Sequence, residues 1–494
     1  MQKSRSRFTC FLSIVVLFVA CSSNEKAMKS ETDSLAIGTT TQLFLDDYII
    51  ESTVGLTKVP NKPDTNRVAL FGADRAWEQR IFYANVIRVG DDWRMYYTAG
   101  VFNGLKGGED VAVGKLPALA ESSNGIDWSF PKLKENIGVF ETTNIILKED
   151  GGGSVNIDDG FGIYDPNAID SEKYKLGYGL WKGGLRIAFS ADGYSFKKYE
   201  GNPVFEDARE DTQQSIVWDP RINKWVWFYR IWDTPTDGRP GWSRFNNTIR
   251  KVGRMESSDF KNWTNPQLIL DRTAEQPANS DWYGLQVTMR HGLMIGLLWT
   301  SEWEDQTVGL IGQQRAQLVV SRDSGLTWAF VDRENLWFDV GPSGSFDDEV
   351  VWPSTIISVA DEDYIYYTGS TYKHASNPSG RSNPYRIGLA RIPRDRFVAM
   401  QAGSGEGSLT TKVITIPERK KLYLNVDVKG TGYCKVEVEG ANGEPLLGES
   451  LSISSSQISE KVEWAMGGIS NFGYQNARLK FHLKDASIYS FQFK

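Results

Sequence analysis

Apolar residues in this chain occur in short runs that alternate with polar positions or are rich in aromatic residues. Clear examples lie at 93–97 (WRMYY), 225–229 (WVWFY) and 364–367 (YIYY). Alternation with a period of two is typical of β-strands, and no long stretch keeps apolar residues at the spacing of a helix. The pattern predicts an all-β protein.

A turn motif recurs along this pattern, in which a serine precedes an Asn or Asp turn and a large aromatic residue. The copies lie at 122–128 (SSNGIDW), 190–196 (SADGYSF), 257–263 (SSDFKNW) and 321–328 (SRDSGLTW), with a weaker one at 394–397 (RDRF). Their last aromatic residues are 68, 67, 65 and 69 residues apart. A capped turn at this period indicates a radial array of four-stranded sheets. Five copies predict a five-bladed β-propeller over residues 41–402.

The C-terminal part has a different pattern. A Gly- and Ser-rich linker is expected at 403–408, and the runs at 422–428, 435–439 and 477–483 alternate apolar and polar residues. Such alternation is typical of antiparallel strands with one solvated face. We therefore expect a small antiparallel β-sandwich at 409–494.

The N-terminus has the features of an export signal. A cationic start precedes an apolar run from Phe8 to Ala20, which is too short for an ordinary membrane span. The run ends in Phe-Val-Ala-Cys, which resembles the lipobox of bacterial lipoproteins. This resemblance implies a signal peptide at 1–20, lipidation of Cys21, a tether at 21–40 and a lipid-anchored protein of the bacterial cell envelope. The alternative is an ordinary cleaved signal in which Cys21 is incidental.

Composition narrows the function classes. Loss of Lys3, Arg5 and Arg7 with the signal takes the formal net charge from −7 to −10, which disfavours nucleic-acid binding. Of the 3 cysteines, only Cys434 lies in the folded body, and the chain has 3 histidines and no HExxH or CxxC motif. We expect no metal cofactor, although a Ca²⁺ ion held by water and carbonyls would leave no fixed sequence spacing.

In a propeller, the innermost strand of each blade begins or ends at a mouth of the central axis, where ligands bind. Acids and aromatic residues precede the five expected innermost strands, at 77–80, 156–160, 211–214, 281–283 and 345–349. Glycoside cleavage needs one carboxylic acid to protonate the leaving oxygen and a second carboxylate to activate water or attack the sugar. The predicted catalytic or substrate carboxylates are Glu78, Asp211, Asp347 and Glu349. The predicted substrate contacts are Arg80, Asp159, Trp282, Tyr283 and Glu302.

These roles follow from side-chain chemistry. Trp282 and Tyr283 would stack on sugar faces, and Arg80 would bind a carboxylate or sulfate substituent. Glu302 follows the second strand of the fourth blade, from which a long loop would reach the mouth. The alternative for any single acid is that it caps a hairpin or pairs with an arginine at the rim.

Several segments together carry a family resemblance. They are 43–51 (LFLDDYIIE), Trp77-Glu78, the turn motifs, 344–347 (GSFD) and 387–390 (IGLA). The chain is similar to secreted bacterial glycosidase-like proteins, which resemble the five-bladed furanosidase superfamily of arabinanases, levansucrases and invertases. The resemblance implies an acid on each of three innermost strands as base, pKa modulator and general acid. By position, Glu78 or Asp159 would take one of the first two roles and Asp211 the third.

The implied function is a glycoside hydrolase that acts on poly- or oligosaccharides, with inversion favoured by analogy to the arabinanases. The chain lacks the Asn-Asp-Pro-Asn-Gly and Arg-Asp-Pro signatures of the better-studied members. Two other interpretations stay open. One is a non-catalytic surface lipoprotein that binds glycans, and the other is a polysaccharide lyase with Tyr283 as base and Arg80 as uronate clamp.

Overall fold

The computed structural model describes residues 34–494 except 107–108, 135–136, 138, 149–154, 181–182, 209–210, 242–246, 306–310 and 377–383. It describes the backbone alone at 102–106, 109–113, 155–156, 158–159 and 305. The described residues form strands and two short 3-10 turns, η1 (Asp170–Glu172) and η2 (Ile469–Phe472). The expectation of an all-β protein is confirmed at this level. Within the same residues, no helix is long and apolar enough to cross a membrane.

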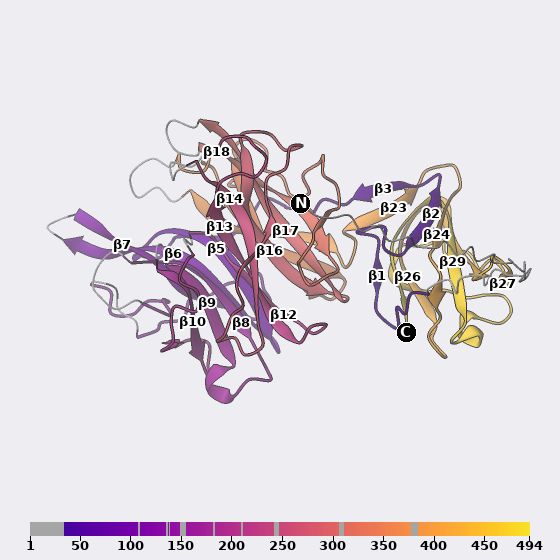
Figure 1. Cartoon of the computed structure of the whole chain (residues 1–494), viewed down its shortest axis with the longest axis horizontal. Helices are drawn as coiled ribbons and strands as arrows, with labels where there is room; N and C mark the ends of the chain where they lie inside the picture. The colour runs from indigo at the N-terminus through magenta and orange to yellow at the C-terminus, as the bar shows by residue number, and fades with distance from the viewer. Residues whose placement is uncertain are drawn as a thin grey trace, which may run out of the picture.

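Most strands belong to antiparallel groups formed by consecutive segments (Figure 1). The first group is β5 (Glu78–Val89), β6 (Asp92–Lys106) and β7 (Glu109–Ser122), and the second is β8 (Val155–Tyr164), β9 (Tyr174–Leu180), β10 (Gly184–Ser190) and β11 (Lys197–Lys198). The third is β12 (Ser215–Asp219), β13 (Lys224–Asp233), β14 (Ile249–Ser257) and β15 (Gln267–Leu270), and the fourth is β16 (Ser280–Arg290), β17 (Leu293–Asp305), β18 (Ile311–Ser321) and β19 (Ala329–Phe330). The fifth is β20 (Val350–Val359), β21 (Glu362–Ser370) and β22 (Tyr385–Pro393), and it is completed by β4 (Ala69–Gly72) from the N-terminal side.

The first strands of the groups lie around a common axis. β5 contacts β8 and β20, and β16 contacts β12 and β20. Hydrogen bonds join neighbours directly: Asn85 accepts from the Gly162 N–H at 2.6 Å, and Ser215 accepts from the Val287 N–H at 2.9 Å. Thr355 accepts from the N–H of the residue after Asn85, at 3.1 Å. These polar side chains therefore satisfy backbone N–H groups near the axis.

The repeated turns pack between strand groups. The hydroxyl of Tyr366 donates to the Gly125 carbonyl at 2.8 Å, and that of Tyr96 donates to the Gly193 carbonyl at 3.2 Å. Each of these turns thus contacts a neighbouring strand group. Gly125 follows the first group, whereas Tyr366 belongs to the fifth. The third copy has no glycine, and Phe260 takes the positive φ (67°) in its place.

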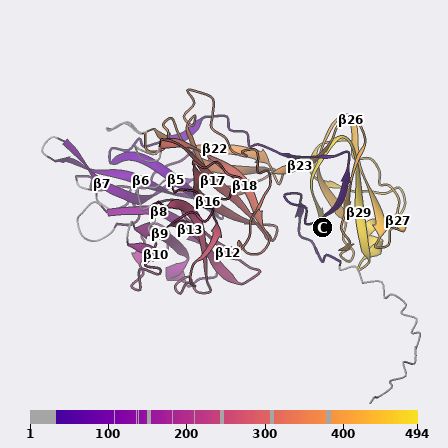
Figure 2. The same cartoon turned by 45° about the horizontal axis from the view of Figure 1, so that its top comes forward.

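The C-terminal residues form a separate body at the right of Figures 1 and 2. Its sheet contains β23 (Val398–Ala402), β24 (Gly407–Thr411), β25 (Ile414–Thr415), β26 (Leu422–Gly440), β27 (Pro445–Leu447), β28 (Gln457–Lys461) and β29 (Asn476–Phe493). Three N-terminal strands join it, β1 (Gln42–Leu43), β2 (Ile50–Val54) and β3 (Thr57–Pro60). The pairing thus brings residues 42–60 to the C-terminal sheet, although the sequence analysis grouped them with residues 41–402.

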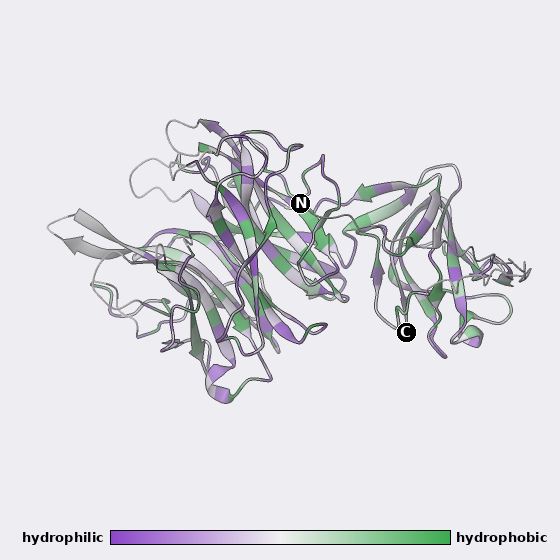
Figure 3. Cartoon of the chain, viewed as in Figure 1, coloured by the Kyte–Doolittle hydropathy of each residue, from purple (hydrophilic) through white to green (hydrophobic). Residues whose placement is uncertain are grey.

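The side chains at 43–45 enter two different cores, because successive side chains of an extended chain point to opposite sides. Leu43 and Leu45 pack with the strands of the fourth and fifth groups. Phe44 lies instead in the core of the C-terminal sheet, 6.2 Å from the ring centroid of Phe491. Green bands alternate with purple ones along many strands of both bodies in Figure 3, which is the pattern of sheets with differing faces.

Candidate functional site

Five aromatic rings gather where the innermost strands begin, at the end of the axis that we call the mouth. The Tyr83 and Tyr283 hydroxyls are 2.9 Å apart, which joins the first group to the fourth. Trp352 lies between them, 4.8 Å from the Tyr83 ring and stacked at 5.6 Å on that of Tyr283. Trp299 and Tyr385 complete the stack, at 5.9 Å and 5.6 Å from Trp352. All five rings are buried, so they form the floor of the mouth.

Tyr83 reaches this position through an irregularity in β5. The register with β6 shifts between Phe82 and Asn85, and Tyr83 has a φ of 59°. A bulky residue with a positive φ is uncommon and is held by its surroundings. Here the N–H of Tyr83 donates to the Thr368 hydroxyl at 3.0 Å. The bulge turns the phenol toward the axis.

Asp211 lies beside this floor, just before β12. Arg230 of β13 donates to the Asp211 carboxylate and to the carbonyl of Tyr283. The Arg230 side chain is 1 % exposed, whereas that of Asp211 is 29 % exposed. Burial disfavours the charged carboxylate, but Arg230, Arg250 and Lys115 outweigh it and lower the pKa of Asp211. Asp211 is therefore an ionised carboxylate that solvent can reach.

A second carboxylate, Asp281, lies deeper beside Arg250 of β14. It accepts from the Arg250 side chain at 3.3 Å and from the Arg250 N–H at 3.2 Å, and both side chains are at most 3 % exposed. Burial raises the pKa of Asp281, although Arg250 and Arg230 oppose this effect. The Arg250 guanidinium lies 4.5 Å from the Trp232 ring and 4.9 Å from those of Tyr283 and Trp303. The mouth thus holds two acids whose pKa values are displaced in opposite directions.

Arg80 lies on the other side of the mouth, in β5. Its stem crosses the backbone of β6 at Gly100, where a Cβ would lie 2.8 Å from the Arg80 Cγ. Burial raises the pKa of Tyr385 to about 12, and Arg80 and Lys115 both act to lower it. This shared influence places both cations near the aromatic floor. Asp159 belongs to β8, but its side chain lies outside the described atoms.

The structure places Glu78 in a buried ion pair. Its carboxylate accepts from Arg75 at 2.6 Å and from the Tyr97 hydroxyl at 2.7 Å, and the residue is 6 % exposed. Burial raises the pKa of Glu78, although Arg75 and Tyr97 oppose this effect. Glu78 packs in the core of the first group and is not brought together with Asp211.

Asp347 has a similar environment within the fifth group. It is fully buried, and it accepts from Arg67, from the Tyr367 hydroxyl at 3.0 Å and from the Ser345 hydroxyl at 2.7 Å. These contacts join β21 to the segments that precede β4 and β20. They correspond to the rim-pairing alternative that the sequence left open for each acid.

Glu349, Glu302 and Trp282 lie toward the rim between the fourth and fifth groups. Glu349 accepts from Gln313 at 2.9 Å, and Glu302 is 54 % exposed and 3.8 Å from Arg315. Trp282 is 3 % exposed and donates to the Asp271 carbonyl at 2.9 Å. It points away from its neighbour Tyr283 because successive side chains alternate along β16. Trp282 and Glu302 line a cavity of about 240 Å³ apart from the aromatic floor.

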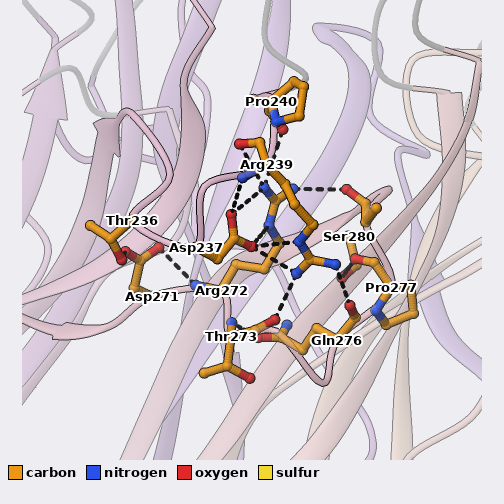
Figure 4. Close-up of polar contacts among 12 residues, drawn as sticks. Thr236, Asp237, Arg239, Pro240, Asp271, Arg272, Thr273, Gln276, Pro277 and Ser280 are labelled. Atoms are coloured by element: carbon orange, nitrogen blue, oxygen red, sulfur yellow. Dashed lines mark hydrogen bonds and ion pairs between the residues drawn. The ribbon is translucent and has the colours of Figure 1, made fainter.

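One carboxylate anchors the loop after β13 and the segment between β15 and β16 (Figure 4). Asp237 accepts from Arg239 at 2.7 Å and 2.9 Å and from Arg272 at 2.7 Å and 3.0 Å. The hydrogen bond from Arg272 is the largest influence and lowers the pKa of Asp237. Arg239 also donates to the Gln276 carbonyl at 2.8 Å, which ties the loop after β13 to the segment that enters β16.

The sequence analysis did not identify Tyr83, Arg230, Arg250, Trp303 or His374 as mouth residues. His374 lies 5.3 Å from the Tyr283 ring and 5.4 Å from that of Trp303. Arg230 and Arg250 lie on the second and third strands of their group, whereas the predicted carboxylates precede the first strands. Their signal is weak, because it consists of single cations within otherwise apolar or mixed strands.

A larger cavity, of about 900 Å³, lies at the opposite end of the axis. The last residues of the innermost strands line it, together with residues from β26, β28 and β29. Among the described side chains, no group of three or more His, Cys, Asp or Glu could hold a metal ion. The expectation of no metal cofactor stays a prediction.

No protein-family model matches the chain. Among curated proteins, the invertase of Schizosaccharomyces pombe is 33 % identical over 82 residues, 15 % of this chain and 14 % of the invertase. The match thus spans a small part of that enzyme.

The chain also aligns with several solved structures. A family 43 arabinoxylan arabinofuranohydrolase from Bacillus subtilis aligns with a TM-score of 0.40 and 9 % identity, over 85 % of this chain and 97 % of that one. A family 32 β-fructofuranosidase from Bombyx mori gives 0.40 and 11 %, over 87 % and 95 %. An N-acetylgalactosamine deacetylase from F. plautii gives 0.44 and 15 %, over 69 % and 96 %. Likenesses this weak transfer neither an architecture nor an activity to this chain.

Proposed function

We propose that this protein is a carbohydrate-active lipoprotein whose mouth hydrolyses a glycosidic bond. In this proposal the five strand groups are the blades of a propeller, and the C-terminal sheet is a β-sandwich packed beside it. The observation that carries the proposal is Asp211, an ionised and partly exposed carboxylate next to a floor of aromatic rings. Aromatic faces and a reactive carboxylate are what sugar binding and cleavage need.

Asp211 acts as the general base. Its lowered pKa keeps it ionised near neutral pH, so it can accept a proton from water that attacks the sugar. This role differs from the general acid that position alone implied. The hydrogen bond from Arg230 orients the carboxylate while leaving it accessible to solvent.

Asp159 and Asp281 are the two candidates for the proton donor. Asp159 lies on β8, beside the strands that carry the rest of the mouth. Asp281 has a raised pKa and can hold a proton at a higher pH than an ordinary aspartate. An inverting enzyme separates its two carboxyl groups by roughly 6.5–9.5 Å, because a water molecule must fit between the base and the sugar.

The test is product release by the mature protein from a panel of oligosaccharides, followed by chromatography. Asp211→Asn is expected to lower the rate by about 10²- to 10⁴-fold, the range typical of general acid–base groups. Asp233→Asn is the matched control, because Asp233 ends β13 and its side chain is 56 % exposed. Saturable glycan binding with no turnover in the unmodified protein would contradict hydrolysis and leave a glycan-binding protein. An unsaturated product would indicate a lyase.

The envelope location is a separate proposal, because Cys21 lies outside the described residues. Fatty-acid labelling of the expressed full chain is expected to mark the protein, and Cys21→Ser is expected to abolish the label. Equal labelling of both forms would contradict lipidation at Cys21.

A further inference from the structure

The mouth collects positive charge in an acidic protein. Arg80 on β5, Lys115 on β7, Arg230 on β13 and Arg250 on β14 all contribute to it. The described carboxylates beside them are those of Asp211 and Asp281. The formal net charge of the whole chain is −7, so this concentration of cations is local.

The Arg250 guanidinium is incompletely satisfied. Its side chain is 3 % exposed, and its Nε has no hydrogen-bond partner among the described residues. Its contact with Asp281, at 3.3 Å, is longer than the 2.7–2.9 Å that is usual between a guanidinium and a carboxylate. A buried donor without an acceptor costs about 1–3 kcal/mol, so such groups generally have a partner in the working state of a protein.

The Arg80 guanidinium is also less fully paired than those of the nearby arginines. Arg67 and Arg75, on the preceding segments, pair with Asp347 and Glu78. No hydrogen bond or ion pair connects Arg80 to another described residue, and its stem lies against Gly100. The side chain is therefore positioned by packing, and its donors remain available.

We propose that the mouth recognises a glycan that carries an anionic substituent, and that Arg80 and Arg250 bind this substituent. A carboxylate and a sulfate ester both present oxygen acceptors that a guanidinium can bind with two parallel hydrogen bonds. A neutral sugar would leave Arg80 without a counter-charge among the described residues, and it would offer the Arg250 Nε no charged acceptor. This inference rests on the proposed function only in taking the mouth as a glycan site, and it holds for binding with or without cleavage.

The test uses calorimetric titration of the mature protein with three kinds of probe. These are an oligosaccharide that contains a uronic acid, a sulfated oligosaccharide, and the same two probes after carboxyl reduction or desulfation. The expected result is that one anionic probe binds at least about 10-fold more tightly than its neutral form. Removing a hydrogen bond to a charged group reduces affinity by roughly 10- to 100-fold, so Arg80→Gln should remove most of this preference.

Arg88→Gln is the control, because Arg88 lies on the same strand, is 40 % exposed and pairs with Asp91 near the opposite end. Arg250→Lys retains the charge at the buried site but loses the bidentate geometry, and it should lower the preference without removing binding. Equal affinity for anionic and neutral probes would overturn the inference while leaving glycan binding intact. An unchanged preference in Arg80→Gln would also overturn it. Binding of no probe would overturn both this inference and the proposed function.

Discussion

Two sets of aspartates in this protein both accept hydrogen bonds, but one set accepts them from neighbouring residues and the other from residues far away in the sequence. In the repeated turns, Asp192 accepts from the N–H groups of Tyr194 and Ser195 at 2.9 Å and 3.1 Å. These donors lie two and three residues further along the chain. At the mouth, Asp211 and Asp281 are instead held by arginines 19 and 31 residues away in sequence, on other strands.

The difference shows which aspartates can vary in role. A turn aspartate binds its own backbone, so any copy of the motif builds the same structure wherever it occurs. An arginine-held aspartate depends on which strands meet, and its pKa follows that environment. Thus the pKa of Asp211 is lowered by its cations, whereas that of Asp281 is raised by burial. Function is expected at the second set and stability alone at the first.

The largest effect is expected at Asp237, an arginine-held aspartate in the loop after β13. Asp237→Asn leaves the fully buried Arg272 without a counter-charge, and the loss of one partner from a buried pair costs about 3–5 kcal/mol. Urea denaturation should show this decrease in the free energy of unfolding. Asp233→Asn, at the end of β13 just before this loop, should change it by less than about 0.5 kcal/mol. A similar small change in both variants would show that the Asp237 cluster does not anchor the loop.

A double-mutant cycle tests the pair of Arg250 and Asp281. Arg250→Met leaves Asp281 buried and uncompensated, with an expected loss of roughly 3 kcal/mol in the free energy of unfolding. Arg250→Met combined with Asp281→Leu should be less destabilised than the sum of the two single variants, because neither charge is then left alone. Additive effects within about 0.5 kcal/mol, measured by urea denaturation, would show that the two side chains are not coupled.

A smaller effect is expected at the turn aspartates. Asp192→Ala removes the acceptor of two backbone N–H groups and should lower the free energy of unfolding by about 1 kcal/mol. Asp192→Asn retains an acceptor oxygen and should lose less. Glycan turnover or binding should be the same in both variants as in the unmodified protein. Loss of activity from Asp192→Asn at unchanged stability would break the distinction between the two sets.

The smallest effect is a pH dependence at the third turn. Burial opposes ionisation of Asp259, but hydrogen bonds from Asn262 and Lys261 outweigh it and lower its pKa from 3.8 to about 2. The pKa is lower in the folded state, so this stabilisation is complete above about pH 4 and is lost as the pH falls toward 2. Solvent screening of this exposed group limits the change to below about 1 kcal/mol. Unfolding between pH 5 and 2 should be less pH-dependent in Asp259→Asn than in the unmodified protein.

The third turn also shows that the repeat predicts a turn from sequence alone. The motif at 257–263 lacks glycine, yet its serine, aspartate and tryptophan predicted the same turn. The structure has that turn, with Phe260 at a φ of 67° and its ring fully buried. Local hydrogen bonds and one buried ring compensate for the unfavourable backbone conformation.

Other features could not be predicted from local pattern. The acids before the innermost strands were all plausible mouth residues, and only their partners separate them. Glu78 lies beside Arg75, within the core of its strand group, and Asp347 lies beside Arg67, which is 280 residues away in sequence. Tyr83 enters the mouth because β5 contains a bulge, and the sequence has no marker for that shift in register.

The sequence by itself determined the strands and the turns, because each depends on side chains a few residues apart and on alternation with a period of two. It also predicted which types of residue to expect at the mouth, since acids, arginines and aromatic rings are what glycan binding and cleavage need. The tertiary structure decided which of these residues meet. Ion pairing, burial and pKa shifts arise between strands far apart in the chain, so Asp211, Arg230 and Arg250 become a site only where β12, β13 and β14 reach the axis.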